Sequence, residues 1–268
     1  MEYPIRLFHF YKNHISLPQL NPDLVIYFWP LPFIKTQLLN KIIIAIDGHS
    51  SCGKSTLAKT LGKALDYTYI STGDMYRAVT LYFIENQIDI GDIDAVKAAL
   101  KKINLHFELG PEGNCIFLNG RNVHQEIRTM RVNDFVSPVS TISEVRREMV
   151  KQQQAMGEKK GIVMDGRDIG TVVFPNAELK IFLTADVEER ARRRYVELIE
   201  KGMDVDYEEV KKNLIDRDRI DSNRADSPLS QAMDAIVVDN TNLDHQQQLD
   251  LVLGMVKQLA DSGKAKQL

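Results

Sequence analysis

Short apolar runs alternate with longer amphipathic stretches from Lys41 to the C-terminus. The apolar runs predict five strands, at Ile42–Asp47, Tyr67–Ile70, Gly161–Asp165, Glu178–Leu183 and Ala235–Asp239. The amphipathic stretches predict helices at Lys54–Leu65, Met75–Gln87, Val187–Lys201, Tyr207–Ile220 and His245–Leu259. Continuous apolar strands that alternate with helices are typical of a parallel sheet covered by helices on both faces. We therefore predict an α/β fold of three layers with a five-stranded parallel sheet.

The alternation is interrupted between residues 103 and 157. The runs LHFEL and CIFLNGRNV flank the turn sequence GPEGN, which predicts an antiparallel hairpin, and polar helices follow. We interpret residues 103–157 as an inserted subdomain. The core would then comprise about 41–102 and 158–268.

Residues 1–40 form an extension of different character. The apolar run Leu24–Ile34 contains two prolines and is shorter than the roughly 20 residues of a membrane-spanning helix. A signal peptide would need a basic start and a small-residue cleavage site, and neither is visible. We assign the extension no catalytic role and expect a chain that begins near Lys41 to keep its activity. A contact with a partner or a membrane surface is the alternative.

The composition indicates a globular protein without a general affinity for nucleic acid. The chain has 268 residues, 44% of them hydrophobic, and a formal net charge of -3, so any anion site must be local. Its two cysteines, Cys52 and Cys115, are too few for a disulfide framework or a zinc site. We expect a cytoplasmic monomer that acts on small molecules, without a nucleic acid or membrane partner.

The first predicted strand leads into GHSSCGKS at Gly48–Ser55, which fits the phosphate-binding pattern G-x-x-x-x-G-K-[ST]. Glycines let backbone N–H groups converge on phosphate oxygens, and the N-terminus of the next helix adds partial positive charge. Lys54 is expected to reach the β- and γ-phosphates of ATP, and the Ser55 hydroxyl to bind Mg²⁺. The residues predicted to bind ATP are Gly48, His49, Ser50, Ser51, Cys52, Gly53, Lys54, Ser55 and Thr56.

Other motifs separate the classes of protein that share this loop. The sequence contains neither the D-x-x-G nor the [NT]-K-x-D motif of a GTPase, and no LSGGQ-like segment of a transporter ATPase. A kinase for a small molecule therefore fits better. A regulatory protein that senses nucleotide without transferring phosphate is the alternative from another class.

A small-molecule kinase also needs arginines that hold an anionic acceptor in line with the γ-phosphate. The second strand leads into STGDMYR, in which Thr72 is expected to cap a helix and Arg77 to lie one turn inside it. The third strand leads into DGRDIGT, which puts Asp165, Arg167 and Asp168 at the carboxyl end of the sheet, where open α/β folds bind ligands. We predict the acceptor site there. A solvated charge at Arg77 and a surface pair of Arg167 with Asp168 are the alternatives.

Two arginine-rich stretches lie within residues 190–228. Arg190, Arg193 and Arg194 fall on one face of a predicted helix, and RDRIDSNRAD contributes Arg217 and Arg224. The stretches are either a solvated basic face or a mobile lid whose arginines stabilise the transferring phosphoryl group and exclude water. We predict a lid. The residues predicted to be catalytic are Lys54, Arg167, Arg190, Arg193 and Arg194.

The segments IAIDGHSSCGKSTLAKTL, ISTGDMYRAV, MDGRDIGTVVFPNAELKIFL and RDRIDSNRADSPL closely resemble those of bacterial-type cytidylate kinases. The resemblance extends from about Lys41 to the C-terminus and includes the insert, whereas residues 1–40 depart from it. It implies a P-loop nucleoside-monophosphate kinase of pyrimidine metabolism that transfers the γ-phosphoryl group of ATP to CMP or dCMP, with Mg²⁺ as cofactor. Another small acceptor, such as UMP, AMP or shikimate, is the alternative on the same fold.

The resemblance also implies which residues bind the acceptor. Arg77, Arg167 and Arg217 would contact its phosphate, and Thr72 stands where the family often has serine. The implied contacts of the cytosine are Ser137, Arg146 and Asp168, and those of the ribose are Asp221 and Arg224.

The implied reaction is direct attack of an acceptor phosphate oxygen on the γ-phosphorus, without a covalent enzyme intermediate. A phosphate whose second pKa is about 6 is largely dianionic at pH 7, so the reaction needs no general base. Ser55 and Asp165 are predicted to hold the metal, Asp165 through water. Asp47, which also ends a strand, is the alternative carboxylate.

Overall fold

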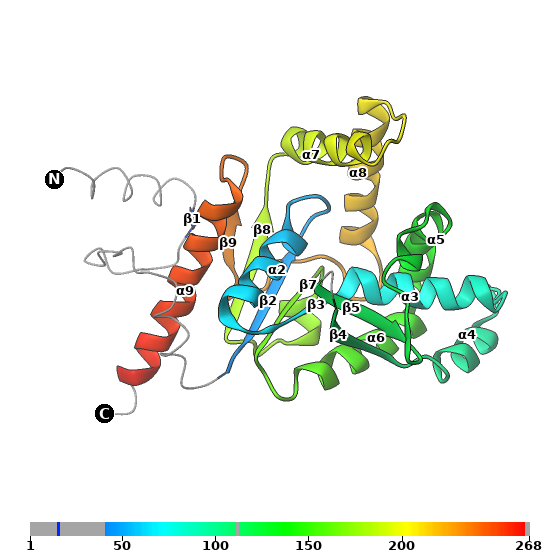
Figure 1. Cartoon of the computed structure of the whole chain (residues 1–268), viewed down its shortest axis with the longest axis horizontal. Coiled ribbons are helices and arrows are strands. Elements are labelled where there is room, and N and C mark those ends of the chain that lie inside the picture. The colour runs from blue at the N-terminus through cyan, green and yellow to red at the C-terminus, as the bar shows by residue number, and fades with distance from the viewer. Residues whose placement is uncertain (1–14, 17–40, 111–112, 266–268) are drawn as a thin grey trace.

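Five parallel strands form the centre of the protein in the computed structural model, which describes residues 15–16, 41–110 and 113–265. In spatial order they are β9 (Ile236–Asp239), β8 (Leu179–Thr184), β2 (Ile43–Gly48), β7 (Ile162–Gly166) and β3 (Thr68–Ser71) (Figure 1). Every neighbouring pair among them is parallel, which confirms the predicted sheet. The carboxyl ends of all five strands therefore lie along one edge, from which the loops that follow them emerge.

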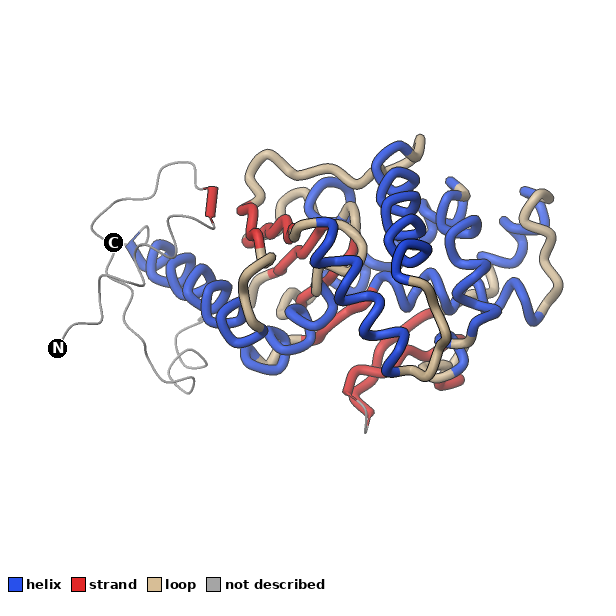
Figure 2. Tube along the Cα trace, turned by 90° about the horizontal axis from the view of Figure 1, so that it is seen from above, coloured by secondary structure: helices blue, strands red, loops and turns tan. Residues whose placement is uncertain are grey.

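Helices cover both faces of this sheet (Figure 2). The helices of the described chain are α2 (Lys54–Leu65), α3 (Thr72–Glu85), α4 (Ile93–Leu100), α5 (Met130–Thr141), α6 (Ser143–Gly157), α7 (Val187–Glu200), α8 (Tyr207–Asn223) and α9 (His245–Ala265). Successive side chains of a strand point to opposite faces. Ile44 and Ile46 accordingly belong to a buried cluster with Leu61 of α2, whereas Ala45 belongs to a second cluster with Met75 of α3. Complete burial of an isoleucine contributes about 1.5–3 kcal/mol to the free energy of folding, so burial on both faces stabilises β2.

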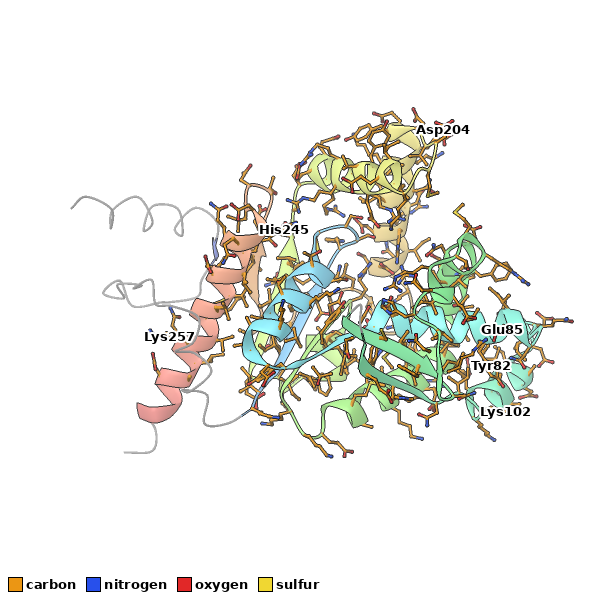
Figure 3. All side chains as sticks on the ribbon, in the orientation of Figure 1. Tyr82, Glu85, Lys102, Asp204, His245 and Lys257 are labelled. Carbon is orange, nitrogen blue, oxygen red and sulfur yellow. The ribbon has the colours of Figure 1, made fainter. Side chains whose placement is uncertain are left out.

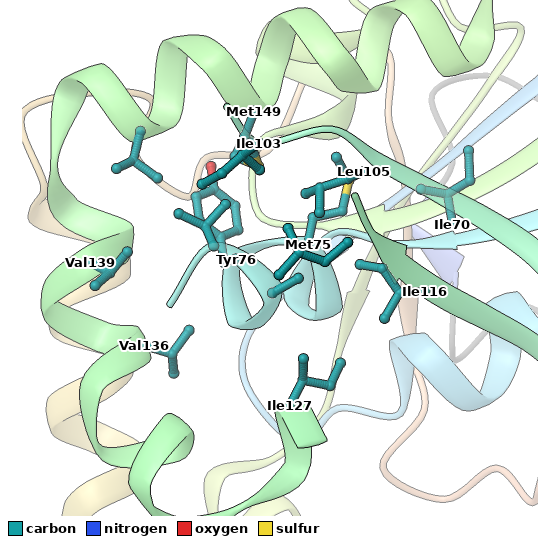
Figure 4. Packing of buried hydrophobic residues seen from close by; sticks show 14 of the residues in the cluster. Ile70, Met75, Tyr76, Ile103, Leu105, Ile116, Ile127, Val136, Val139 and Met149 are labelled. Atoms are coloured by element: carbon teal, nitrogen blue, oxygen red, sulfur yellow. The ribbon is translucent and has the colours of Figure 1, made fainter. Parts of the chain in front are cut away.

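The inserted subdomain begins with a separate three-stranded antiparallel sheet, as the hairpin pattern predicts. Its strands are β4 (Leu105–Gly110), β5 (Gly113–Leu118) and β6 (Arg121–Asn122). Met75 and Tyr76 of α3 lie among Ile116, Val136 and Met149 of the insert (Figure 4). The insert thus shares its hydrophobic core with α3 instead of folding around one of its own.

Several local features differ from the sequence prediction. Helix α4 was not predicted. It is short, and the Asp92 carboxylate caps it by accepting hydrogen bonds from two backbone N–H groups at 3.0 Å. Thr72 is not the cap of α3: Ser71 holds that position, and its hydroxyl accepts a hydrogen bond from the Asp74 N–H at 3.3 Å. The helix begins one residue earlier because the backbone of Ser71 is still extended and that of Thr72 is already helical.

A hairpin of α7 and α8 follows the carboxyl end of β8, and its distal turn carries Asp204 (Figures 1 and 3). Residues 190–228, here called the lid, comprise most of this hairpin and the segment after it. Helix α8 runs three residues beyond its predicted end at Ile220, to Asn223. Asp221 is therefore part of the helix, and its side chain reaches Arg167.

The described part of the extension is the strand β1 (Ile15–Ser16), which pairs antiparallel with β9 at the edge of the main sheet. The remaining residues before Lys41 lie outside the described residues, and with them the run Leu24–Ile34 and most of the segment expected to be dispensable. Among the helices that the structure describes, none is long and apolar enough to cross a membrane.

Candidate active site

The loop between β2 and α2 has the backbone geometry of an anion site. Gly48 and Gly53 have φ of 148° and 87°, and Ser51 has φ of 58°. A Cβ atom on Gly48 would lie 2.0 Å from the carbonyl oxygen of Leu183, so a larger residue would displace β8. The loop leads directly into α2, whose first N–H groups have no partner within the helix. These donors can bind phosphate oxygens.

Lys54 folds back over this loop. Its Nζ donates a hydrogen bond to the carbonyl oxygen of His49, and its side chain is buried. Burial lowers the pKa of Lys54, and the positive charges of Arg167 and Arg217 lower it further, while Asp165 opposes them. The ammonium group is therefore held at the loop and feels the charges of two arginines of the predicted acceptor site, Arg167 and Arg217.

Oxygen atoms suited to a hard cation lie beside the loop. The Ser55 hydroxyl donates to Asp165 Oδ2 at 2.8 Å, and the Tyr69 hydroxyl donates to Asp165 Oδ1 at 2.9 Å. Mg²⁺ in kinases is commonly held by one or two protein oxygens together with water and substrate phosphates. Within the described residues, no cluster of three or more His, Cys, Asp or Glu could hold a metal by itself. The adjacent oxygens of Ser55 and Asp165 fit a metal that is also bound by nucleotide phosphates.

The Asp47 carboxylate has a different task. It accepts hydrogen bonds from the N–H groups of Ile169 at 2.8 Å and Gly170 at 2.7 Å. Burial raises the pKa of Asp47 to about 6, although these two bonds oppose the shift. Because both oxygens hold the turn that follows β7, Asp165 is the better candidate for a metal ligand.

Two arginines predicted to bind the acceptor phosphate are held by acidic and amide groups. Arg77 Nε donates to Asn133 Oδ1 at 3.3 Å, and its Nη1 lies 3.6 Å from Asp74 Oδ1. Arg167 Nε donates to Asp221 Oδ2 at 2.7 Å. Each contact fixes one side of a guanidinium group and leaves other N–H groups for a ligand.

Arg217 is exposed and has no hydrogen-bond or ion-pair partner among the described residues. Partial removal from water, followed by the positive charges of Arg167, Arg77 and Arg194, lowers the pKa of Arg217 to about 10. Mutual repulsion of this kind requires that the four arginines lie near one another. Their cluster is a local positive site on a protein of net negative charge, and a bound anion would relieve the repulsion.

A second group of charges alternates in sign beside this cluster. Arg146 Nη2 donates to Asp168 Oδ2 at 2.7 Å, and Arg224 Nη2 lies 3.7 Å from Asp168 Oδ1. Arg224 Nη1 in turn donates to Asp221 Oδ1 at 3.4 Å. Burial raises the pKa of Asp168, while Arg146 and Arg224 oppose the shift. Asp221 also binds Arg167, so this network joins the predicted base and phosphate contacts.

Two buried donors of this network have no hydrogen-bond partner among the described residues. They are Arg146 Nε and Arg224 Nη2, the second of which makes only the longer ion pair with Asp168. A buried donor without an acceptor costs about 1–3 kcal/mol, so acceptor atoms of a ligand would be favoured here. The Tyr76 ring, 5.5 Å from Arg146 Cζ, lies against the guanidinium group and limits its rotation.

Thr72 and Ser137 lie near these groups in different ways. The buried Thr72 hydroxyl donates to the carbonyl oxygen of Asp165 at 2.7 Å, so it already fixes the loop after β7. Ser137 lies one turn before Ser140, whose carbonyl oxygen accepts a hydrogen bond from Arg146 at 3.2 Å. Within the described chain, no hydrogen bond joins the Ser137 side chain to Arg146 or Asp168. Contact of Thr72 and Ser137 with a substrate stays a prediction.

The three predicted lid arginines have different surroundings. The buried Arg190 donates to the carbonyl oxygens of Ala185 at 3.1 Å and Ser50 at 3.2 Å. Arg193 donates to Asn240 Oδ1 at 3.1 Å and to its carbonyl oxygen at 2.9 Å. Arg194, held by a hydrogen bond to Glu197, is the one of the three whose charge acts on Arg77 and Arg217.

The sequence prediction did not include several polar residues of this region. Tyr69 binds Asp165, Asn133 binds Arg77, and Asp218 binds the loop through the Ser50 N–H at 3.1 Å. Asn240 Nδ2 donates to the carbonyl oxygen of Cys52 at 2.7 Å, so β9 also supports the loop. Asp218 directly follows Arg217, and that position is a signal that could have pointed to it.

Two hollows of the surface lie away from this site. One of about 430 Å³ is lined by Ile43, Phe174 and Glu178, and one of about 280 Å³ by Leu105 and Gln152. Ile43 and Glu178 lie at the amino ends of β2 and β8, the edge of the sheet opposite to the loop. Chemistry and position therefore identify the site, because its converging charges lie at the carboxyl edge.

The parallel sheet, the glycine loop with Lys54 and the facing arginines define a P-loop phosphotransferase. The family model for cytidylate kinase matches residues 44–258. The chain therefore belongs to the cytidylate kinase family. A cytidylate kinase of Flavobacterium johnsoniae is 53% identical over 223 residues, which cover 81% of this chain and 97% of that protein.

Two further relatives show the same similarity. A cytidylate kinase of Parabacteroides distasonis is 55% identical over 215 residues, which cover 78% of this chain and 94% of that protein. A cytidylate kinase of Porphyromonas gingivalis is 49% identical over 231 residues, which cover 84% of this chain and 100% of that protein.

Proposed function

We propose that this protein is a nucleoside-monophosphate kinase that transfers the γ-phosphoryl group of ATP to CMP, and also to dCMP. The observation that carries the proposal is the position of Lys54, which binds the glycine loop through the His49 carbonyl oxygen and feels the charges of Arg167 and Arg217. The ammonium group can therefore act on the phosphates of a donor at the loop and lies near the arginines proposed to bind the acceptor. Membership of the cytidylate kinase family supports the choice of CMP as acceptor.

On the donor side, the N–H groups of residues 48–56 bind the phosphates of ATP. Lys54 neutralises charge on the β- and γ-phosphates. Its contact with the His49 carbonyl oxygen keeps the ammonium group over the loop before ATP binds. This arrangement lowers the cost of reorganisation during the transfer, because the charge is already in place.

Mg²⁺ is the metal that this site suits. Ser55 and Asp165 would hold it, Asp165 through water, and the ion would neutralise charge on the phosphates of the donor. The Tyr69 hydroxyl restrains the Asp165 carboxylate, and the Ser55 hydroxyl, which now donates to the same carboxylate, would be available to the metal.

On the acceptor side, Arg77, Arg167 and Arg217 bind the phosphate of CMP. The acceptor oxygen then attacks the γ-phosphorus directly, and ADP leaves with the electrons of the broken P–O bond. The phosphate is already ionised at neutral pH, so catalysis rests on position and charge. Arg194, whose charge acts on Arg77 and Arg217, would stabilise the transferring group. Closure of the lid would exclude water.

The base contacts would select cytosine. An arginine donates to O2 and N3 of cytosine, and a carboxylate accepts from its exocyclic amine, whereas uracil presents a donor at N3 and an acceptor at O4. Arg146 and Asp168 supply this pair, and the unpaired Nε of Arg146 is a donor that still needs an acceptor. Asp221 and Arg224 extend the same network and are the proposed contacts of the ribose.

We further propose that the protein acts as a cytoplasmic monomer on small molecules. The net charge of -3 and the confinement of positive charge to the arginine cluster support a small anionic substrate over nucleic acid.

A panel of acceptors tests the function. The full chain with ATP and Mg²⁺ would be given CMP, dCMP, UMP, AMP or shikimate, and release of ADP would be followed with a coupled assay. We expect kcat/KM to be highest for CMP and to exceed that for UMP by at least about 10-fold, because the wrong base leaves buried groups unpaired. A higher kcat/KM with UMP, AMP or shikimate would replace CMP as the acceptor. Folded protein that binds ATP but releases no acceptor-dependent ADP would instead indicate a nucleotide sensor.

A further inference from the structure

The lid binds both sides of one residue of the phosphate loop, Ser50. The Ser50 N–H donates to Asp218 Oδ1 of α8 at 3.1 Å, and the Ser50 carbonyl oxygen accepts from Arg190 Nη1 of α7 at 3.2 Å. Arg190 Nη1 also donates to Asp218 Oδ2, which closes a ring of three contacts. The peptide groups before and after Ser50 are thus both bound by the lid.

The next residue explains why such support matters. Ser51 has φ of 58°, a left-handed conformation that a residue with a side chain adopts at a cost. The conformation persists where neighbouring contacts hold it. Arg190 and Asp218 supply these contacts, because the carbonyl group that Arg190 binds belongs to the peptide between Ser50 and Ser51.

The pair suits this task electrostatically. Arg190 is buried and Asp218 is largely so, with 13% of its side chain exposed. Although burial opposes the shift, contacts with His49 and Arg190 and the Ser50 N–H lower the pKa of Asp218 to about 2. The carboxylate therefore stays ionised at every pH at which a kinase works.

One helix presents groups to both substrates. On α8, Arg217 joins the acceptor arginines, Asp221 binds Arg167, and Asp218 binds the donor loop. The three side chains lie within little more than one helical turn, so α8 cannot move at the acceptor side without pulling on Ser50.

We propose that Asp218 and Arg190 are positioning residues that hold the phosphate loop in its nucleotide-binding shape and tie that shape to the lid. They touch neither substrate. Arg190 then acts through the loop instead of on the transferring phosphoryl group. The inference rests on the proposed function for its acceptor, but its donor-side consequence does not depend on which acceptor is used.

The test compares binding of the two nucleotides to variants of the full chain. Titration calorimetry would measure the dissociation constants of ADP with Mg²⁺ and of CMP, each alone. We expect Asp218→Ala to weaken ADP binding about 10-fold, the loss of a hydrogen-bonded charge, and to change CMP binding by less than about 2-fold. Asp218→Asn keeps an acceptor for the Ser50 N–H but lacks the charge that binds Arg190, so we expect a smaller loss of ADP affinity.

Asp216→Asn is the matched control, because Asp216 lies on the same helix and pairs with the exposed Arg219. It should leave both affinities unchanged. If Asp218→Ala does not fold, Asp218→Asn decides the matter with the same two titrations. Unchanged ADP affinity, or an equal loss for ADP and CMP, would overturn the positioning role. Failure of the wild type to phosphorylate CMP would refute the proposed function alone, since ADP binding is measured without any transfer.

Discussion

The donor side and the acceptor side of this site use different kinds of chemical group. The donor side uses backbone N–H groups and one lysine within residues 48–56, and its shape depends on glycine conformations that neighbouring residues set. The acceptor side uses side-chain charges from α3, α6, α8 and the turn after β7, and nearly every one of them binds an opposite charge. Backbone groups bind any phosphate, whereas paired charges can distinguish one ligand from another. Loss of a donor-side group should therefore affect all acceptors alike, whereas loss of an acceptor-side group that contacts the base should affect them unequally.

Lys54→Ala should have the largest effect. We expect kcat to fall by at least about 100-fold with every acceptor, because a single charge stabiliser of the transition state is lost. Steady-state rates with CMP and UMP would show the fall, and circular dichroism would confirm that the variant is folded. Near-normal kcat in folded protein would show that this loop does not perform the transfer.

Asp47 connects the two sides, because it ends β2 and holds the turn after β7. Its pKa is raised from 3.8 to about 6 in the folded state, so the folded protein binds this proton more tightly than the unfolded chain. The stability that this proton provides is fully present below about pH 4 and is lost as the pH rises through about 6. The free energy of unfolding of the wild type, relative to Asp47→Asn, should fall by about 2 kcal/mol between pH 4 and pH 7. Urea denaturation at several pH values measures the difference, and parallel pH profiles of the two proteins would contradict it.

Asp168→Asn should have the smallest effect but the most selective one. The amide introduces a donor where the carboxylate accepts from cytosine, so we expect the ratio of kcat/KM for CMP over UMP to shrink from its wild-type value of at least about 10. Asp74→Asn is the control, since Asp74 pairs with Arg77 on the phosphate side and its loss should lower both rates together. An unchanged ratio in Asp168→Asn would mean that Asp168 only anchors Arg146.

Periodicity and short motifs were enough to predict the sheet, the helices and the donor loop. The strand β2 is apolar on both faces and leads directly into GHSSCGKS, and the structure has both where they were expected. The strands, the long helices and the donor loop depend on residues that are neighbours in the chain, so the sequence carries their signal directly. Helix α4 was missed because it is short, and the cap of α3 was placed one residue late.

The tertiary structure alone decided what each charged side chain contacts. Arg190, Arg193 and Arg194 share a helix face, yet one binds Ser50, one binds Asn240 and one binds Glu197. Asp47 and Asp165 both end strands, yet the first holds a backbone turn and the second binds Ser55.

The sequence by itself determined the fold class, the phosphate loop and the set of arginines available to a second anion. It did not determine that Asp218, 168 residues away, would bind Ser50, or that Asp168 would lie between Arg146 and Arg224. Backbone conformation and hydrophobic periodicity follow from local sterics and burial, which consecutive residues specify. A long charged side chain has many rotamers and several candidate partners, and the packing of distant helices selects among them because a buried charge must be paired.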